Sequence, residues 1–352
     1  MIQSTSRRTV LRGLAGAALG SALPGAVLAQ GAAPDRFFAG KTIRLLVGTG
    51  AGAGYDLMGR MLAEHMPRFI PGAPKIVVEN MVGAGSLVMA NYLANRAPRD
   101  GTVMGLPLNS IILEPSVKLL SRAGGAAQFD LAQMNWIGSP CEEPPVLWVM
   151  SHTKFQRFAD CQAEKMIVGA SARGADNFTV ALLNNKLLGT QLNIVSGYQG
   201  TNDLFLAADR GEIQGGNTAY SAILLGRPDW VRSGKVRILA QYGRERTADL
   251  MDVPTGIELA TTPNAKRILE ALSSKFRAAY PFLLPQETPA QQVATLRAAF
   301  SQTMVDAEFK AAIAKLGLKL NPVDGEALTA LVRAANDMPA ELIEEFRRAT
   351  EG

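Results

Sequence analysis

The segment from Ile43 to Met66 constrains the fold most, because it predicts a strand, a glycine-rich loop and a helix in direct succession. Ile43–Val47 is a short apolar run, typical of a strand that is buried on both faces. Gly48–Gly54 alternates glycine with small residues, so a bound group can approach its backbone closely. Beyond this loop, apolar residues recur at the spacing of one helix face: Leu57, Met58, Met61, Leu62 and Met66.

Two interpretations of the glycine-rich loop stay open. Its N–H groups and the positive end of the following helix are suited to binding an anion. Alternatively, the loop is only a tight turn between strand and helix, in which Asp56 is the helix N-cap.

Residues 1–30 predict a twin-arginine signal peptide. Arg7 and Arg8 precede a mildly apolar, Gly/Ala-rich run that ends in small residues at a plausible cleavage position. The run is short and glycine-rich for a membrane span. It also contributes three of the net positive charges on the chain, so the remainder is nearly balanced. We therefore expect a periplasmic protein that does not bind nucleic acid.

The length of the remaining chain predicts two lobes, since one core rarely serves more than about 250–300 residues. Cys141 and Cys161 both lie in this exported portion, where a disulfide can persist. Their separation in space is not given by the sequence, so a bridge and two free thiols both remain possible.

Strand–loop–helix units repeat along the first part of the chain. Lys75–Glu79 and Thr102–Leu106 are further predicted strands, and a helix is expected over Leu87–Arg96. Such a succession predicts an α/β fold, with a mostly parallel sheet flanked by helices and its loops gathered at one edge. Gly85 and Ser86 lie in the loop before that helix and could help to bind an anion.

The pattern restarts after a proline-rich connector at Trp136–Pro145. Val146–Met150, Met166–Val168, Leu192–Val195 and Val236–Ala240 are predicted strands. Two further loops precede helices, at 169–177 and 196–200, and Thr201 is a candidate cap for the second helix. The C-terminal part has helical spacing over 291–300, 307–316, 325–335 and 340–349, and we expect these helices to cover the first lobe.

Taken in order, these motifs resemble the periplasmic solute-binding proteins of tripartite tricarboxylate transporters, the Bug family. The resemblance covers nearly all of the mature chain. Its motifs are the first strand with a loop ending in Asp56, then Val78-Glu79-Asn80 with Gly83-Ala84-Gly85, then Ala97-Pro98 and Asp100-Gly101, then Tyr198-Gln199-Gly200, and last Val236–Ala240 with Arg246 and Asp252–Thr255.

The resemblance implies a two-lobed, type II periplasmic-binding (Venus flytrap) fold that closes on a small carboxylate. It further implies a monomer without a cofactor that docks on transporter membrane subunits. The chain departs from the family pattern at Thr49, Ala51, Ala53 and Tyr55, and Arg173 is added in the second loop. The ligand is therefore expected to be unusual, such as a larger or an aromatic acid. Arg173 either pairs with its carboxylate or is a solvated surface residue.

Catalytic or metal-binding groups are hard to assemble from this sequence. We interpret its two histidines, His65 and His152, as ordinary surface or boundary residues. The alternative function is an exported NAD(P)-dependent oxidoreductase, since Gly48–Ala53 fits G-x-G-x-x-A and Glu79 ends the second strand. However, Glu79 comes about ten residues later than the dinucleotide fingerprint expects.

We therefore expect capture of a ligand without chemistry. One lobe is predicted over residues 31–140 and 245–352, the other over 141–244, with hinges at Ser139–Pro145 and Ala240–Arg244. Asp56 is expected to fix its own loop or to receive an ammonium or hydroxyl group. Tyr55, Tyr198 and Tyr220 either shape the cleft or belong to the core. The candidate ligand-binding residues are Gly50, Ala51, Gly52, Ala53, Gly54, Tyr55, Asp56, Gly85, Ser86, Ser171, Arg173, Gly174, Ala175, Asp176, Asn177, Tyr198, Asn217 and Thr218.

Overall fold

The computed structural model describes residues 36–114, 127–171 and 175–350. These residues belong to one compact unit, Arg36–Gly352. The predicted signal peptide and two candidate ligand residues, Arg173 and Gly174, lie outside the described residues.

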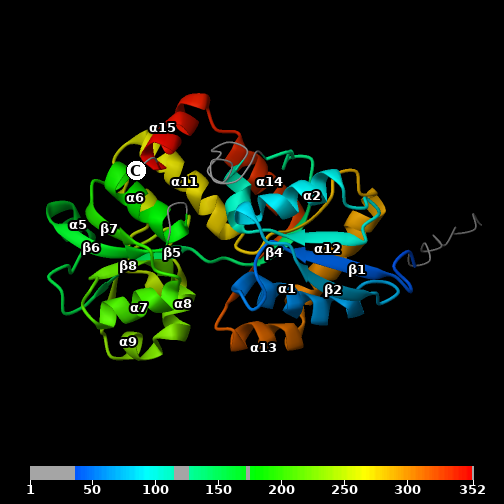
Figure 1. Ribbon diagram of the computed structural model, residues 1–352, viewed down its shortest axis with the longest axis horizontal. Helices are drawn as coiled ribbons and strands as arrows, with labels where there is room; N and C mark the ends of the chain where they lie inside the picture. The colour runs from blue at the N-terminus through cyan, green and yellow to red at the C-terminus, as the bar shows by residue number, and fades with distance from the viewer. Residues whose placement is uncertain (1–35, 115–126, 172–174, 351–352) are drawn as a thin grey trace, which may run out of the picture. The chain divides into compact units, whose positions relative to one another are not determined.

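The first sheet has six strands and a parallel half, as the repeated strand–loop–helix units predict (Figure 1). Its order is β11-β4-β10-β3-β1-β2, in which β1 pairs in parallel with β2 and β3, while β10 and β11 are antiparallel to their neighbours. The strands are β1 (Thr42–Val47), β2 (Lys75–Asn80), β3 (Val103–Leu106), β4 (Asn135–Cys141), β10 (Phe282–Leu284) and β11 (Leu320–Asp324).

Helices cover both faces of this sheet because β1 is apolar on both faces. Ile43, Leu45 and Val47 share one core with α1, α12 and α13, whereas Leu46 packs in another core with α2 and α14. This confirms β1 as a strand buried on both faces. The helices and 3-10 turns around the sheet are α1 (Gly54–His65), η1 (Met66–Phe69), η2 (Ala84–Ser86), α2 (Leu87–Asn95), η3 (Asn109–Leu113), α12 (Ala290–Val305), α13 (Ala307–Lys315) and α14 (Gly325–Asn336).

The second sheet has five strands in the order β7-β6-β8-β5-β9. β6 is parallel to β7 and β8, and β5 is antiparallel to β8 and β9. The strands are β5 (Pro145–Met150), β6 (Lys165–Ala170), β7 (Gln191–Ser196), β8 (Gly215–Ala219) and β9 (Val236–Gln241).

Helices cover both faces of the second sheet as well, and successive side chains along β5 pack alternately on the two faces. In β5, Val146 and Trp148 pack with α7, α8 and α9, whereas Leu147 and Val149 pack with α5 and α6. These helices are α5 (Phe158–Ala163), α6 (Asp176–Leu188), α7 (Thr201–Asp209), α8 (Tyr220–Gly226) and α9 (Pro228–Arg232).

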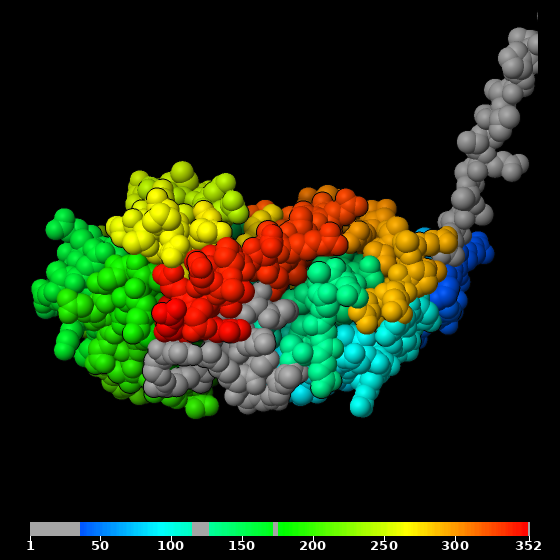
Figure 2. All heavy atoms as spheres, turned by 90° about the horizontal axis from the view of Figure 1, so that it is seen from above, coloured from blue at the N-terminus to red at the C-terminus, as the bar shows by residue number. Residues whose placement is uncertain are grey.

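The C-terminal helices do not all cover the first sheet, contrary to expectation. The last helix, α15 (Ala340–Thr350), packs against α6 and α11 (Pro263–Arg277), and Figure 2 shows this red segment beside the green and yellow ones. Its apolar face carries Leu342, Phe346 and Ala349, which are buried in the same core as Val180 and Leu183 of α6.

The segment after β9 stays attached to that strand beyond the predicted crossing at Ala240–Arg244. The buried side chain of Gln241 donates to the carbonyl oxygens of Leu250 and Val253 at 2.9 and 2.7 Å, and its own oxygen accepts from the Thr247 N–H group. Gln241 also pairs with Thr255. This segment contains η4 (Ala248–Leu250) and is followed by α10 (Gly256–Leu259). We propose that the second crossing lies further along, within α11.

The structure decides three local details that the sequence left open. Helix α1 begins at Gly54, so Asp56 lies inside its first turn and is not the N-cap. Helix α7 begins at Thr201 and its N-cap is Gly200. Cys141 and Cys161 are free thiols, each buried in a different core, so the structure contains no bridge between them.

Candidate functional site

A cavity of about 240 Å³ is lined by strands β5 and β8 of the second sheet and by helices and loops that pack around the first. Six of the candidate ligand residues line it: Tyr55, Ala175, Asp176, Asn177, Asn217 and Thr218. Sequence analysis did not single out several other lining residues: Asn109, Glu143, Pro145, Ala219, Phe276, Ala279 and Tyr280.

Asn217 and Thr218 are polar residues near the end of β8, opposite Leu147 and Val146 in the sheet register. This register places Asn217 on the face covered by α6 and Thr218 on the face covered by α7. Both residues are buried. The side-chain oxygen and nitrogen of Asn217 and the hydroxyl of Thr218 have no hydrogen-bond partner among the described residues. Buried polar side-chain atoms usually have a hydrogen-bond partner.

Two helices begin at the same cavity. Ala175–Asn177 at the start of α6 and Thr201 at the start of α7 are among its lining residues. Helix starts present free N–H groups and a positive partial charge, which favour an anion. Asn177 also anchors its own loop, because its side chain accepts from the Ser171 N–H group at 3.1 Å and donates to the Ser171 hydroxyl at 3.0 Å.

Aromatic and acidic groups form another part of the wall. The rings of Tyr55 and Tyr280 lie 4.9 Å apart between centroids, and the Tyr55 hydroxyl accepts from the Asn109 N–H group at 3.1 Å. Glu143 accepts from the Tyr280 hydroxyl at 3.0 Å and from the Ser221 hydroxyl at 2.6 Å. Burial raises the pKa of Glu143, while these two hydrogen bonds act in the opposite direction.

The first glycine loop is organised by Asp56. The Asp56 carboxylate accepts from the Gly52 N–H group at 2.8 Å, from Arg60 Nε at 2.9 Å and from Asn80 Nδ2 at 2.9 Å. Gly52 has a φ of +80°, a conformation that glycine adopts readily. Gly50–Gly54 and Asp56 are not among the lining residues of the cavity, although Tyr55 is.

Ser86 also has a structural partner set. Its buried hydroxyl donates to the carbonyl oxygen of Gly48 at 3.1 Å and accepts from the Leu108 N–H group at 3.0 Å. It thereby joins the loop after β1 to the chain after β3. Gly85, Ser86, Ser171 and Tyr198 are outside the cavity lining, and the ring of Tyr198 packs against the core beneath α7.

A second cavity, of about 410 Å³, shares Glu143 with the first. Its lining includes Tyr220, Glu142, Thr247 and Lys319. We favour the smaller cavity as the ligand site, because it contains the predicted loop before α6 and the unpartnered atoms of β8.

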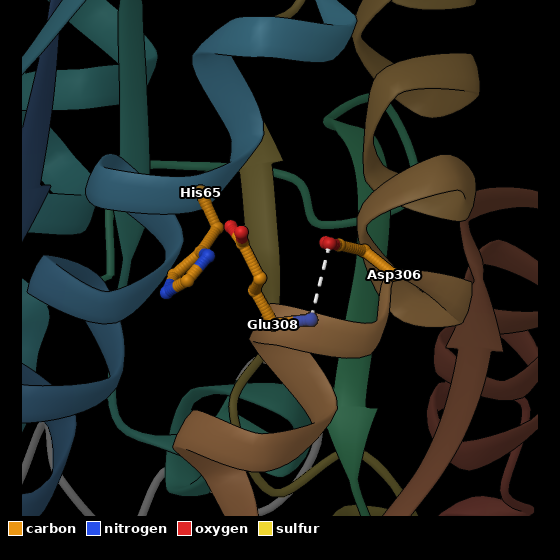
Figure 3. Close-up of side chains that lie close together, drawn as sticks. All are labelled: His65, Asp306 and Glu308. Atoms are coloured by element: carbon orange, nitrogen blue, oxygen red, sulfur yellow. Dashed lines mark hydrogen bonds between the residues drawn. The ribbon is translucent and has the colours of Figure 1, made fainter.

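His65, Asp306 and Glu308 form one group with metal-ligand spacing among the described residues (Figure 3). Arg68 already fills this position. Its guanidinium group pairs with both carboxylates and lies 3.4 Å from Nδ1 of His65. A divalent ion would have to displace that cation, so the group gives no support to a metal centre.

The dinucleotide alternative depends on Glu79, but this residue is engaged elsewhere. Its two carboxylate oxygens accept from Arg44 on the neighbouring strand at 2.8 and 2.7 Å, in a bidentate pair.

A family model described as the tripartite tricarboxylate transporter family receptor, TctC, matches residues 58–347. This chain belongs to the TctC family. The family resemblance of the sequence is thereby confirmed, and the family is one of periplasmic solute-binding receptors. The oxidoreductase alternative finds no support in it. A curated relative, the UPF0065 protein in the gbd 5′ region of Cupriavidus necator, is 27% identical over 251 residues, which cover 69% of this TctC-family chain and 71% of that protein.

Solved structures that are similar to this chain have the two-lobed fold of periplasmic binding proteins, and the chain shares that fold. A TctC solute-binding protein from Polaromonas has a TM-score of 0.66 and 18% identity, covering 87% of this chain and 98% of its own. MatC from Rhodopseudomonas palustris, solved with bound malate, has a TM-score of 0.60 and 20% identity, covering 89% and 100%. Another R. palustris protein, solved with adipate, has a TM-score of 0.61 and 17% identity, covering 87% and 97%.

Among the residues that the model describes, no helix of this TctC-family receptor has the length and apolar character needed to cross a membrane.

Proposed function

We propose that this receptor captures a small organic carboxylate in the cavity between β8, the start of α6 and the Tyr55–Tyr280 pair. The observation that supports this most is the pair of buried, unpartnered side chains, Asn217 and Thr218, at a cavity where two helices begin. The two side chains offer neutral hydrogen-bond donors to an anion, and the two helix starts offer positive partial charge. Malate and adipate in proteins of the same fold are consistent with a carboxylate.

The size of the cavity favours a small ligand. Pockets for drug-sized molecules usually span about 300–1,000 Å³, and this cavity measures about 240 Å³. We therefore expect an acid with few carbon atoms. The larger or aromatic ligand that the departures in the first loop suggest would require the cavity to widen.

The loaded receptor would then deliver its ligand to the membrane subunits of a tripartite tricarboxylate-type transporter. We further propose that the chain reaches the periplasm by the twin-arginine route, on the basis of Arg7, Arg8 and the apolar run that follows. It would act as a monomer without a cofactor and without catalysing a reaction.

A thermal-shift screen of the purified, ligand-free receptor tests the proposed function. The panel contains mono-, di- and tricarboxylates, aromatic acids and amino acids. A true ligand at 100 times its dissociation constant adds about 2.7 kcal/mol to the free energy of unfolding. Calorimetry with Asn217→Ala should then show affinity lowered about tenfold or more.

Asn193→Ala is the matched control, because Asn193 is exposed on β7 of the same sheet. It should leave the affinity unchanged. No response to any acid in the panel, or equal losses in both variants, would contradict the proposed site.

A further inference from the structure

The described lining of the ligand cavity is acidic, although its proposed ligand is an anion. Glu143 and Asp176 are among its lining residues, whereas no lysine, arginine or histidine is among those that the structure describes there. The ammonium group of Lys275 is paired with Asp176. A second carboxylate on the ligand would therefore meet negative charge.

Glu143 is held in place by groups from three different parts of the fold. Its N–H group donates to the carbonyl oxygen of Phe276 at 3.0 Å, at the end of α11. Its carboxylate oxygens accept from Ser221 of α8 and from Tyr280 before β10. All of these contacts fix the position of the carboxylate before any ligand binds.

The Glu143 carboxylate retains capacity to accept. An ionised carboxylate has about four lone-pair positions, and the structure assigns two of them to the Ser221 and Tyr280 hydroxyls. Both hydroxyls donate to the carboxylate, so Glu143 acts as a hydrogen-bond acceptor in both contacts. A third donor that reaches it from the cavity would form a charge-assisted hydrogen bond.

We propose that the cavity selects a small amino-substituted carboxylate, whose ammonium group binds Glu143 while its carboxylate faces Asn217 and Thr218. This inference depends on the proposed function and narrows its ligand class. Asp176 is already neutralised by Lys275, whereas Glu143 has no paired cation among the residues that the structure describes. The zwitterionic ligand supplies that cation and brings no second anion to the acidic wall.

Matched sets of compounds test the ligand class on the unaltered receptor. Each set contains an amino acid, the acid that lacks its amine, and the diacid in which a carboxylate replaces the amine. β-Alanine, propionate and succinate form one set, and 4-aminobutyrate, butyrate and glutarate form another. The proteinogenic amino acids and their deaminated forms extend the series. We expect the tightest ligand, measured by calorimetry, to carry an amine and to bind at least tenfold more tightly than its two counterparts.

Glu143→Gln tests the residue. The amide keeps the size of the side chain but removes the charge, so the preference for the amine over its deaminated counterpart should fall at least tenfold. The control is Glu142→Gln, the neighbouring acid, which lines only the second cavity and should keep the preference. Circular dichroism checks that both variants fold, and Glu143→Ala, which also removes the charge, replaces the glutamine variant if that one does not.

The outcomes separate the two proposals. If carboxylates bind but the tightest one carries no amine, or if Glu143→Gln keeps the full preference, the inference about amines is overturned and carboxylate capture stands. If no carboxylate binds at all, the proposed function is overturned and the inference with it.

Discussion

Asp56 and Glu143 are both carboxylates, but their neighbours shift their pKa values in opposite directions. Hydrogen bonding to Arg60, together with the Gly52 N–H group and Asn80, lowers the pKa of Asp56 to about 2. Burial raises the pKa of Glu143, whose carboxylate has hydroxyl neighbours and, within the described part of the chain, no paired cation. At the residue scale, one carboxylate stabilises its own loop, and the other is the one that we propose accepts from the ligand.

The lowered pKa of Asp56 predicts a pH-dependent stability. Because its folded pKa lies below the ordinary value of about 3.9, Asp56 stabilises the fold above pH 4, and this contribution is lost as the pH falls from about 4 to 2. Asp56→Asn should lower the free energy of unfolding by about 1–2 kcal/mol at pH 7, since the Arg60 side chain is half exposed. Urea unfolding at a series of pH values measures both effects.

A suitable control is Asp203→Asn. Asp203 accepts from the Gln199 N–H group at 3.2 Å, again four residues back, but no ion pair is recorded for it among the described residues. A smaller loss of stability is expected there. An Asp56→Asn protein that loses no stability at pH 7 would show that Asp56 does not stabilise its loop.

At the scale of elements, strands with an ordinary apolar pattern could be predicted, and strands rich in glycine or proline could not. β1 is confirmed because Ile43–Val47 is apolar at every position except Arg44. β4 contains Gly138, Ser139 and Pro140, which are typical of a connector. Its glycine is needed because a Cβ atom at Gly138 would lie 2.3 Å from the ring of Phe300. That requirement comes from a helix far along the chain, so no local pattern reports it.

The ligand cavity was predictable only in part for the same reason. The loop at Ala175–Asn177 precedes a helix, which the sequence indicates directly. Glu143 and Tyr280 meet in the cavity wall through a hydrogen bond, but they lie 137 positions apart in the sequence, so no local pattern indicates the contact. β8, with the sequence Gly215–Ala219, lacks the apolar run of a typical strand, so Asn217 and Thr218 came from the family resemblance alone.

The packing of α15 gives a prediction for that element. Phe346 is fully buried in the core shared with α6. Phe346→Ala should lower the free energy of unfolding by about 3–5 kcal/mol, because the cavity left behind cannot be refilled. Urea unfolding followed by circular dichroism measures the loss.

Glu341→Ala serves as the control on the same helix, since Glu341 is exposed and should change stability by less than about 0.5 kcal/mol. If Phe346→Ala were equally mild, the docking of α15 on α6 would not contribute to the stability of the fold.

At the scale of the whole molecule, the cavity is lined by the second sheet and by helices and loops around the first, so ligand binding should favour the approach of the two sides. We expect the radius of gyration, measured by small-angle X-ray scattering, to decrease when the ligand identified by the thermal-shift screen is added at saturation. The Asn217→Ala variant, at a ligand concentration that saturates only the unaltered receptor, should show little change. An unaltered radius with bound ligand would argue against closure by the lobes.

The central position of β8 in its sheet limits how the ligand preference of such a receptor can be changed. β8 is hydrogen-bonded to β6 on one side and to β5 on the other. Its side chains therefore cannot be redirected without disturbing both neighbours. A directed-evolution library for a new ligand should leave this strand intact and diversify Glu143, Tyr280 and the residues at the start of α6, which line the cavity from outside β8.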